Sequence, residues 1–505
     1  MIKQNYENIK NNFEIKENLQ AIKDDLKDVN KGSRSKEALL FLINGDFSVF
    51  TELLKHEDPK IRKNTASILG LLGSDDNVDA LYEAYTVETT MYNKAAYIEA
   101  LRRLHFQKYT EDLKKRFESL KKEKITVENK KHIIEEVNQL KKIFGTGKKE
   151  FTGYNLLNNV LLTTNRNFKN ITADAVADIP HSEFAAGVKV RTSDLKKILS
   201  IRTYDEILFI PDRVNTVSND PVKAAKELVD QGIKDYIFER IGILNENGRV
   251  TGGMTVNFRS ELRAKDKFAY PDFTKKISAE LETLTNWELV NSVSNYDLEL
   301  RFIPNSNGKL NVLIKFFILK DVRFSYRHEI LPVCMRPYLA ATLMQLAKPY
   351  FVKNAAILDP FCGTGTLLAE REAAGSSTAR IYYGIDIFKE AVEKTSENLK
   401  SFGMLRKTEL INKDFFTFEH EYKFDEIITD MPVVTEKKTL RDIEEIYAKF
   451  FEKCDSLLEK KGVMIVYSRN PEFVKKFYAK SGCSMNEDFE ISKIENSHLF
   501  ILTRQ

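Results

Sequence analysis

The stretch ILDPFCGTGTLLAE, residues 357–370, joins an apolar run to a turn rich in glycine and threonine. The run ends at the carboxylate of Asp359, and Gly363 and Gly365 allow the backbone to take positive φ and to approach a ligand closely. We expect the run to be a strand and a helix to begin at Thr366. A strand that ends at a carboxylate and turns tightly into a helix is suited to holding a ligand at its tip.

Regular alternation of strands and helices follows this stretch through residues 331–505. Apolar segments (IYYGID, TELIN, FDEIITD, GVMIVYS) alternate with helical ones (KEAVEKTSENLKSF, RDIEEIYAKFFEKCDSLL, PEFVKKFYAK), and HLFILTRQ reads as a last strand. Repeated strand–helix units predict a doubly wound, Rossmann-like α/β domain with a parallel sheet. Ligands of such sheets bind beyond the carboxyl ends of the strands.

Four successive strands of this domain end at, or just before, an aspartate. These residues are Asp359, Asp386, Asp414 and Asp430, and Phe415 follows the third of them. An acidic side chain about twenty residues after the glycine turn can accept hydrogen bonds from ribose hydroxyls. A single aspartate in such a place is most often a helix N-cap. Four of them at one edge of a sheet favour a nucleoside cofactor.

The sequence of the glycine turn distinguishes between nucleoside cofactors. It reads DPFCGTGT rather than G-x-G-x-x-G. It therefore lacks the glycine-lined helix N-terminus that takes a pyrophosphate. S-adenosylmethionine is accordingly favoured over NAD.

The composition sets limits on the rest of the chain. With 505 residues and an apolar share of 42% the chain is long enough for three or four packed domains, and its net charge of +4 permits nucleic-acid binding without requiring it. The four cysteines lie far apart and the seven histidines show no ligand spacing, so we expect neither disulfides nor a metal. Without a signal-peptide core or a membrane-length apolar run, the chain is predicted to be cytoplasmic.

Residues 1–148 have the apolar spacing of helices and are rich in Lys and Glu. The segment DPKIRKNTASILGLLG (58–73) recurs loosely as TMYNKAAYIEALRRL (90–104), a period of roughly thirty residues typical of stacked helix pairs. The first copy resembles a HEAT repeat. We therefore expect a HEAT-like helical domain that could serve as a platform for a protein partner.

From Phe151 the sequence changes to short β-branched runs such as NVLLTTNRNF, EILFIP and LNVLIKFFILKDVRF, separated by helical pieces. Strands and helices without regular alternation predict an α+β middle region. We expect two parts, 149–215 and 216–330.

The motif DPFCGTGTLLAE with the downstream DMP resembles class I S-adenosylmethionine-dependent methyltransferases. More narrowly, it is similar to the THUMP-containing RNA guanine-N2-methyltransferases, which act on tRNA and 23S rRNA. NYDLELRF (295–302) resembles the last strand of their THUMP domain. The segment 324–347 resembles the joining segment with its Arg-Pro pair, and 184–209 resembles the ferredoxin-like piece before THUMP. The resemblance covers about 150–505, and residues 1–148 fall outside it.

The resemblance implies a role for each matching residue. The middle parts would be a ferredoxin-like domain and a THUMP-like domain that grips the tRNA acceptor end. The target guanine, flipped into the pocket, would present its amine to the catalytic motif Asp430, Met431 and Pro432. The residues implied in cofactor binding are Arg336, Pro337, Asp359, Phe361, Gly363, Thr364, Gly365, Thr366, Asp386, Ile387, Asp414, Phe415 and Asp430. The candidate phosphate contacts are Arg259, Arg263, Lys265, Arg323 and Arg327.

One position departs from the family pattern. Members usually carry an aromatic residue after the proline of the fourth motif, where this chain has Val433 and Val434. Stacking of a base on an aromatic ring is worth roughly 1–3 kcal/mol, so another ring, Tyr326 or Tyr467, would have to replace it. Three alternatives stay open: 23S rRNA as the substrate, methylation of adenine N6, and a non-catalytic RNA-binding or assembly factor that keeps the cofactor fold.

Overall fold

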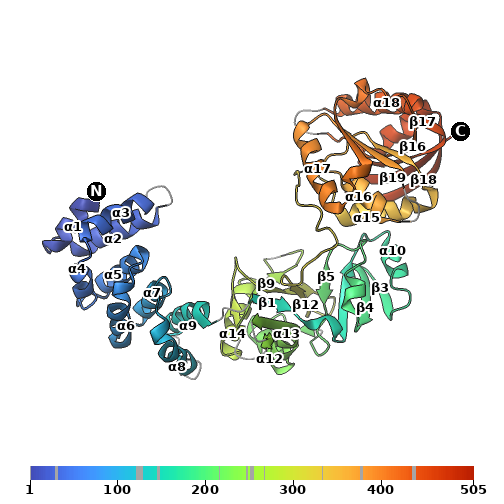
Figure 1. Ribbon diagram of the computed structural model, residues 1–505. Helices are drawn as coiled ribbons and strands as arrows, with labels where there is room; N and C mark the ends of the chain where they lie inside the picture. The colour runs from blue at the N-terminus through green and yellow to red at the C-terminus, as the bar shows by residue number, and fades with distance from the viewer. Residues whose placement is uncertain are drawn as a thin grey trace. The chain divides into compact units, whose positions relative to one another are not determined.

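The computed structural model describes residues 2–28, 32–120, 129–144, 148–214, 216–245, 248–250, 255–266, 268–332, 334–375, 379–434 and 439–505 (Figure 1). The chain divides into two compact units. Unit 1 consists of Met1–Lys149, Gly242–Arg259 and Thr274–Tyr296, and unit 2 of Glu150–Ile241, Ser260–Phe273 and Asp297–Gln505. This division cuts through 216–330, so the boundaries expected for a ferredoxin-like and a THUMP-like domain stay predictions.

The amino-terminal part of unit 1 is helical, as its apolar spacing predicts (Figure 1). Helix α5 (Pro59–Leu72) begins after Asp58, whose carboxylate caps the first turn, and packs against α7 (Met91–Leu101). A Cβ on Gly70 would lie 2.6 Å from Ala100 Cα, so this glycine lets the two helices approach closely. The two similar stretches of sequence thus lie on neighbouring helices; their identity as HEAT repeats stays a prediction. The other helices are α1 (Ile2–Lys10), α2 (Ile15–Lys27), α3 (Gly32–Ile43), α4 (Ser48–Leu53), α6 (Val78–Val87), α8 (Thr110–Leu120) and α9 (Lys130–Phe144).

Short strands complete unit 1. β10 (Leu289–Asn291) runs parallel to the first residues of β9 (Val256–Leu262), and α14 (Phe273–Leu284) lies between them in the sequence. β7 (Ile241–Asn245) pairs with β8 (Gly248–Val250) in an antiparallel hairpin. Among the described ranges, no helix combines the length and hydropathy that a membrane crossing requires.

The first part of unit 2 is an antiparallel sheet with helices, which confirms the mixed α/β middle region (Figure 1). Its strands follow the order β11-β12-β5-β2-β4-β3, with β6 beside β12. Each neighbouring pair is antiparallel. The elements are β1 (Lys148–Phe151), β2 (Asn158–Thr163), α10 (Lys169–Asp174), β3 (His181–Phe184), β4 (Gly187–Thr192), α11 (Leu195–Ile198), β5 (Ile207–Phe209), β6 (Thr216–Val217), α12 (Pro221–Asp230), α13 (Ile233–Arg240), β11 (Leu298–Pro304) and β12 (Leu310–Phe316).

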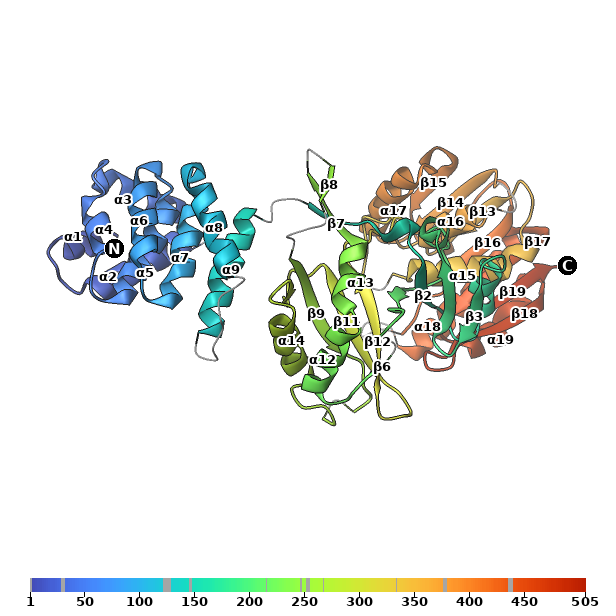
Figure 2. The ribbon, with the colours of Figure 1, turned by 90° about the horizontal axis from the view of Figure 1, so that it is seen from below.

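The carboxyl-terminal part of unit 2 is the expected Rossmann-like domain, with strand order β15-β14-β13-β16-β17-β19-β18 (Figure 2). The first five strands are parallel, but β19 runs antiparallel to both β17 and β18. The prediction of a wholly parallel sheet is therefore wrong at this edge, and β18 was not predicted. The strands are β13 (Ala356–Asp359), β14 (Ile381–Asp386), β15 (Thr408–Asn412), β16 (Phe424–Asp430), β17 (Leu458–Ser468), β18 (Cys483–Ser492) and β19 (Ser497–Arg504).

Helices cover both faces of this sheet because neighbouring residues of its buried strands point to opposite sides. Ile357 packs with α15 (Pro337–Ala347), α16 (Thr366–Ala373) and α17 (Lys389–Phe402) in one apolar cluster. Leu358 packs in a second cluster that includes residues of α18 (Leu440–Leu457) and α19 (Pro471–Phe477). This three-layer arrangement leaves the carboxyl ends of the parallel strands as the open edge of the domain.

Buried polar contacts join the middle region to this domain within unit 2. Arg202 Nε and Nη2 each lie 2.8 Å from a carboxylate oxygen of Glu370 on α16, and Tyr326 donates its hydroxyl hydrogen to the same carboxylate at 2.8 Å. The side-chain amide of Asn165 donates to the carbonyl of Ile491 at 2.9 Å. These contacts join residues of the middle region to helix α16 and to the carboxyl end of β18.

Candidate active site

The turn after β13 has the conformation that its glycines allow. Gly363 has a φ of 54° and Gly365 a φ of 77°. A Cβ on Gly363 would meet no atom within 4 Å, whereas a Cβ on Gly365 would lie 2.8 Å from Thr395 Cγ2 on α17. Gly363 therefore leaves room for a ligand, and Gly365 permits packing between the turn and a helix.

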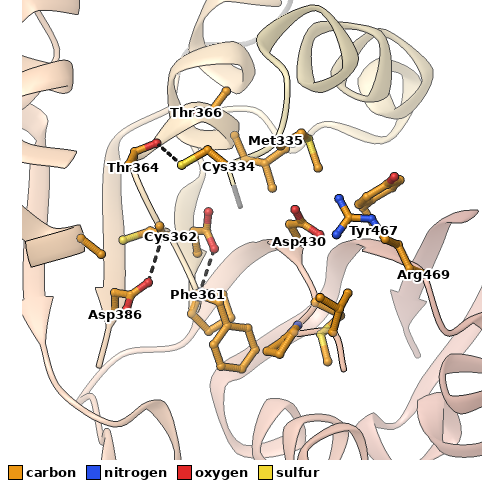
Figure 3. Close-up of a pocket in the computed structure, with 18 of the residues that line it drawn as sticks. Cys334, Met335, Phe361, Cys362, Thr364, Thr366, Asp386, Asp430, Tyr467 and Arg469 are labelled. Carbon is orange, nitrogen blue, oxygen red and sulfur yellow. Dashed lines mark hydrogen bonds between the residues drawn. The ribbon is translucent and has the colours of Figure 1, made fainter. Parts of the chain in front are cut away.

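The turn opens on a cavity of about 1210 Å³ at the carboxyl ends of the parallel strands (Figure 3). Pro337 and Gly365 do not line this cavity: Pro337 opens α15 and Gly365 is the N-cap of α16. All other predicted cofactor and catalytic residues line it, namely Arg336, Asp359, Phe361, Gly363, Thr364, Thr366, Asp386, Ile387, Asp414, Phe415, Asp430, Met431 and Pro432.

Three of the four strand-end carboxylates hold the loops around the cavity. Asp386 accepts hydrogen bonds from the backbone N–H groups of Gly363 (3.0 Å) and Phe388 (2.9 Å). Asp414 caps a short 3₁₀ turn by accepting from Phe416 N–H at 2.9 Å. Asp359 accepts from the N–H two residues further on, at 3.2 Å. These three carboxylates therefore stabilise the backbone turns that surround the cavity.

Asp430 differs from the other three. Its Oδ1 atom is buried and has no hydrogen-bond partner among the described residues. Burial raises the pKa of Asp430 to about 6, against the attraction of the Arg469 guanidinium, which lowers it. Burial also raises the pKa of Asp359 well above its usual range, and the charges of Asp386 and Asp430 add to that rise. The cavity thus concentrates carboxylates, one of which is poised to change its charge near neutral pH.

The aromatic residues at the cavity do not all lie as expected. Phe415 is 2% exposed and packs with its centroid 5.7 Å from that of Phe361 and 5.9 Å from that of Phe450. Phe415 nevertheless lines the cavity, so its part in cofactor binding stays a prediction; the less buried Phe416 also lines it. Tyr326 binds Glu370 and does not line the cavity, whereas Tyr467 does.

Several lining residues were not predicted from the sequence. Arg469 follows the carboxyl end of β17 and lies close to Asp430 and Tyr467 (Figure 3). A search for polar residues after every strand, rather than for carboxylates alone, would have found it. Lys449 of α18 and Cys334 also line the cavity, and the Cys334 sulfur lies 3.1 Å from Thr364 Oγ1. Tertiary packing brings these two residues to the cavity, so no local sequence pattern could have predicted them.

The predicted phosphate contacts fall into two groups. The side chain of Arg323 is only 3% exposed and donates to the carbonyl of Tyr204 at 2.7 Å, so its predicted role on an RNA-binding surface is wrong. Arg327 donates to the carbonyl of Met335 at 3.0 Å and is half-buried. The other three, Arg259, Arg263 and Lys265, lie in or just after β9, where Arg263 and Lys265 are exposed.

Metal chemistry finds no support in the described part of the chain. It contains no group of three or more His, Cys, Asp or Glu side chains arranged to hold a metal ion. All four cysteines are free thiols.

Comparison with known proteins agrees with this geometry. Residues 325–494 match the family model described as UPF0020, RMKL-like, methyltransferase domain. This region is a methyltransferase domain. The strands that carry Asp359, Asp386 and Asp430 all lie inside the match. The fold is that of the class I methyltransferases, whose methyl donor is S-adenosylmethionine.

Two curated relatives resemble part of the chain. The tRNA (guanine(10)-N2)-dimethyltransferase of Methanothermobacter thermautotrophicus is 36% identical over 135 residues, which are 26% of this chain and 38% of that protein. The enzyme of the same name from Methanocaldococcus jannaschii is 35% identical over 123 residues, 23% of this chain and 33% of that protein. The chain thus spans little more than a third of the length of these relatives.

A solved structure extends the likeness of fold beyond the methyltransferase domain. The crystal structure of TrmN from Thermus thermophilus superimposes with a TM-score of 0.51 at 16% identity, covering 69% of this chain and all of that one. At this identity the comparison concerns the fold alone. It agrees with a mixed α/β region preceding a Rossmann-like methyltransferase domain.

Proposed function

We propose that this protein is an S-adenosylmethionine-dependent RNA methyltransferase that modifies the exocyclic N2 of a guanosine in tRNA. The methyltransferase domain supports the reaction class, and the names of the two curated relatives support the substrate. The observation that carries the proposal is Asp430, a buried carboxylate with an unpartnered oxygen in a cavity that three other strand-end aspartates surround.

The cavity suits the cofactor chemically. S-adenosylmethionine carries a cationic sulfonium and a cationic ammonium group, which carboxylates attract. The open space over Gly363 allows a close approach to the backbone, and Asp386 ends the second strand, where an acidic side chain can accept hydrogen bonds from ribose hydroxyls. When bound, the cofactor supplies an electrophilic methyl group.

Asp430 would act on the amine that receives the methyl group. As a carboxylate it accepts a hydrogen bond from the amine and orients the nitrogen lone pair. Its pKa of about 6 makes it both ionised at pH 7 and able to take up the proton that the methylated amine releases. The Met431 and Pro432 carbonyls, which follow on the same loop, would add further acceptors for the amine.

Binding of the RNA would fall to the middle region. We propose that the expected ferredoxin-like and THUMP-like parts hold the tRNA and that Arg259, Arg263 and Lys265 contact phosphates, since Arg263 and Lys265 are exposed cations. The HEAT-like helices of unit 1 would serve a protein partner.

The test uses purified full-length protein, labelled S-adenosylmethionine and separate pools of unmodified tRNA and rRNA fragments, digested to nucleosides after reaction. Label in N2-methylguanosine from tRNA supports the proposal when Asp430→Ala abolishes it. Asp455→Ala, a change at an exposed aspartate of α18, serves as the matched control and should leave it intact.

Each other outcome points to a different alternative. Label from rRNA alone would move the substrate to 23S rRNA, and label in N6-methyladenosine would reassign the target base. No label, together with measurable cofactor binding, would refute the catalytic proposal and favour a binding factor, with Val433 and Val434 as the reason for the lost activity.

A further inference from the structure

Arg469 is a cation placed where the proposed reaction would occur. Arg469 follows β17, and Tyr467 of β17 is paired in parallel register with Asp430 of β16. Arg469 and Asp430 therefore lie at the same edge of the sheet. The two side chains lie close together in the cavity (Figure 3). Among the described residues no carboxylate oxygen comes within 4.0 Å of the guanidinium, which lies 5.8 Å from the centroid of the Tyr467 ring.

The charge of Arg469 indicates which ligand it serves. A guanidinium repels the sulfonium and ammonium groups of S-adenosylmethionine, whose single anionic group is the carboxylate of its methionine part. Asn165, Arg336 and Glu495 line the same cavity. None of them belongs to the glycine turn or to the loop after β15, the segments that carry Gly363 and Asp414. Arg469 lies beside Asp430, which the proposed function places at the accepting amine, and this position assigns Arg469 to the part of the cavity left for the acceptor.

A carboxylate beside a guanidinium makes a definite pattern of hydrogen bonds. Along its Watson–Crick edge guanine presents two donors, N2–H and N1–H, and then the acceptor O6. A carboxylate matches the first two groups and a guanidinium the third. Adenine has an acceptor at N1, which a carboxylate repels. Enzymes that flip a base read it through this edge.

We propose that Arg469 is a specificity-determining residue that donates hydrogen bonds to O6 of the target guanine while Asp430 accepts from its N1–H and N2–H groups. The inference rests on the proposed function and adds to it the means by which the enzyme chooses guanine. A site built to hydrogen-bond a substrate group rejects an analogue that lacks the group, because its own polar atoms are then left unpaired.

The test removes each partner of the Arg469–O6 contact separately and then both together. The tRNA that accepts label is made with guanosine or with 2-aminopurine at the labelled position. 2-Aminopurine keeps the 2-amino group but lacks both O6 and the N1–H, so the loss of the N1–H contact to Asp430 is common to every protein variant and cancels when the variants are compared on this RNA. The wild type and Arg469→Met are compared by kcat/KM on both RNAs. Arg469→Lys retains one donor, and Arg406→Met removes an exposed cation of the same domain outside the cavity.

On the guanosine RNA we expect Arg469→Met to lower kcat/KM by on the order of 10- to 100-fold. On the 2-aminopurine RNA it should change kcat/KM less than twofold, because the acceptor is already gone. Arg469→Lys should recover part of the loss and Arg406→Met should behave as wild type. Binding of S-adenosylhomocysteine to Arg469→Met should equal that of the wild type, which shows that the variant is folded.

If Arg469→Met lowered kcat/KM equally on both RNAs, Arg469 would not act through O6 and the proposal would be overturned. An unchanged kcat/KM of Arg469→Met on the guanosine RNA would overturn it as well. A loss of S-adenosylhomocysteine binding in both Arg469 variants would show that the residue supports the fold or the cofactor instead. Absence of labelled guanosine with the wild type is a different result, because it overturns the proposed function itself.

Discussion

Replacing Asp430 with asparagine should stabilise the carboxyl-terminal domain while it abolishes methyl transfer. Burial raises the pKa of this carboxyl from 3.8 to about 6. The folded state therefore holds the proton more tightly than the unfolded state, and ionisation of Asp430 costs stability. This cost is absent below pH 3.8, grows as the pH rises towards 6, and is complete above that pH.

The size of the effect follows from the shift. About two pKa units at 1.36 kcal/mol per unit give a cost of about 3 kcal/mol above pH 6 and about half of that at pH 5. Asparagine has a similar shape and no charge at any of these pH values. Asp430→Asn should therefore be more stable than the wild type by about 3 kcal/mol at pH 7.5 and by about 1.6 kcal/mol at pH 5.

Hydrogen exchange measured by mass spectrometry reports the stability difference between the two proteins locally. A local measurement is needed because a chain of several domains need not unfold in one step. The opening free energies of peptides covering β16 and β17 are compared between the wild type and Asp430→Asn at both pH values. Peptides of the helices in unit 1 serve as the internal control and should not change. If the wild type and Asp430→Asn were equally stable at pH 7.5, or if their difference did not depend on pH, the conclusion that ionisation of Asp430 destabilises the domain would be refuted.

Three further predictions concern the same domain. The kcat/KM for labelled RNA should fall about tenfold per pH unit below an apparent pKa near 6, since protonated Asp430 cannot take up the proton that the methylated amine releases; a flat profile down to pH 5 would argue against this role. Gly363→Ala should lower the affinity for S-adenosylhomocysteine in calorimetric titrations and lower the unfolding free energy by about 1–2 kcal/mol, because alanine is strained at its positive φ. Gly365→Ala should lower the unfolding free energy by about 2–5 kcal/mol, because the same strain is joined by a clash of its Cβ with a side chain of α17; the reverse order would contradict the structure. Glu426→Gln should destabilise the domain by about 3–5 kcal/mol in hydrogen exchange, since it leaves the fully buried guanidinium of Arg371, now 2.7 Å from Glu426, without its counter-charge; a cost below 1 kcal/mol would show that the pair is dispensable.

Much of the candidate site could be predicted because it depends on strand ends. The apolar runs before Asp359, Asp386 and Asp430 identify strands, and regular alternation with helices makes those strands parallel. Parallel strands bring their carboxyl ends to one edge, so Asp359 and Asp430, 71 positions apart in the sequence, line one cavity. The spacing of Gly363 and Gly365 likewise identifies the turn, since few other residues take positive φ.

Other features could not be predicted because local sequence does not encode burial. From the sequence Arg323 was predicted to contact phosphates, but its guanidinium donates to three backbone carbonyls of the middle region. The strand β18 was missed because its sequence CSMNEDFEIS is polar, as suits an edge strand with one exposed side. The burial of Phe415 depends on Phe361 and Phe450, which come from other segments of the chain.

The sequence by itself determined that a Rossmann-like domain carries a ring of carboxylates and a glycine turn at one edge of its sheet, because secondary-structure periodicity and turn chemistry are local properties. Tertiary structure decided which of those groups are free to act. The backbone around Asp359, Asp386 and Asp414 uses their carboxylates in turns, while Asp430 is buried with an unpartnered oxygen and has Arg469 beside it. The pKa of a carboxyl and the partners of a cation depend on how much water and which charges surround them, and only the packed chain sets those surroundings.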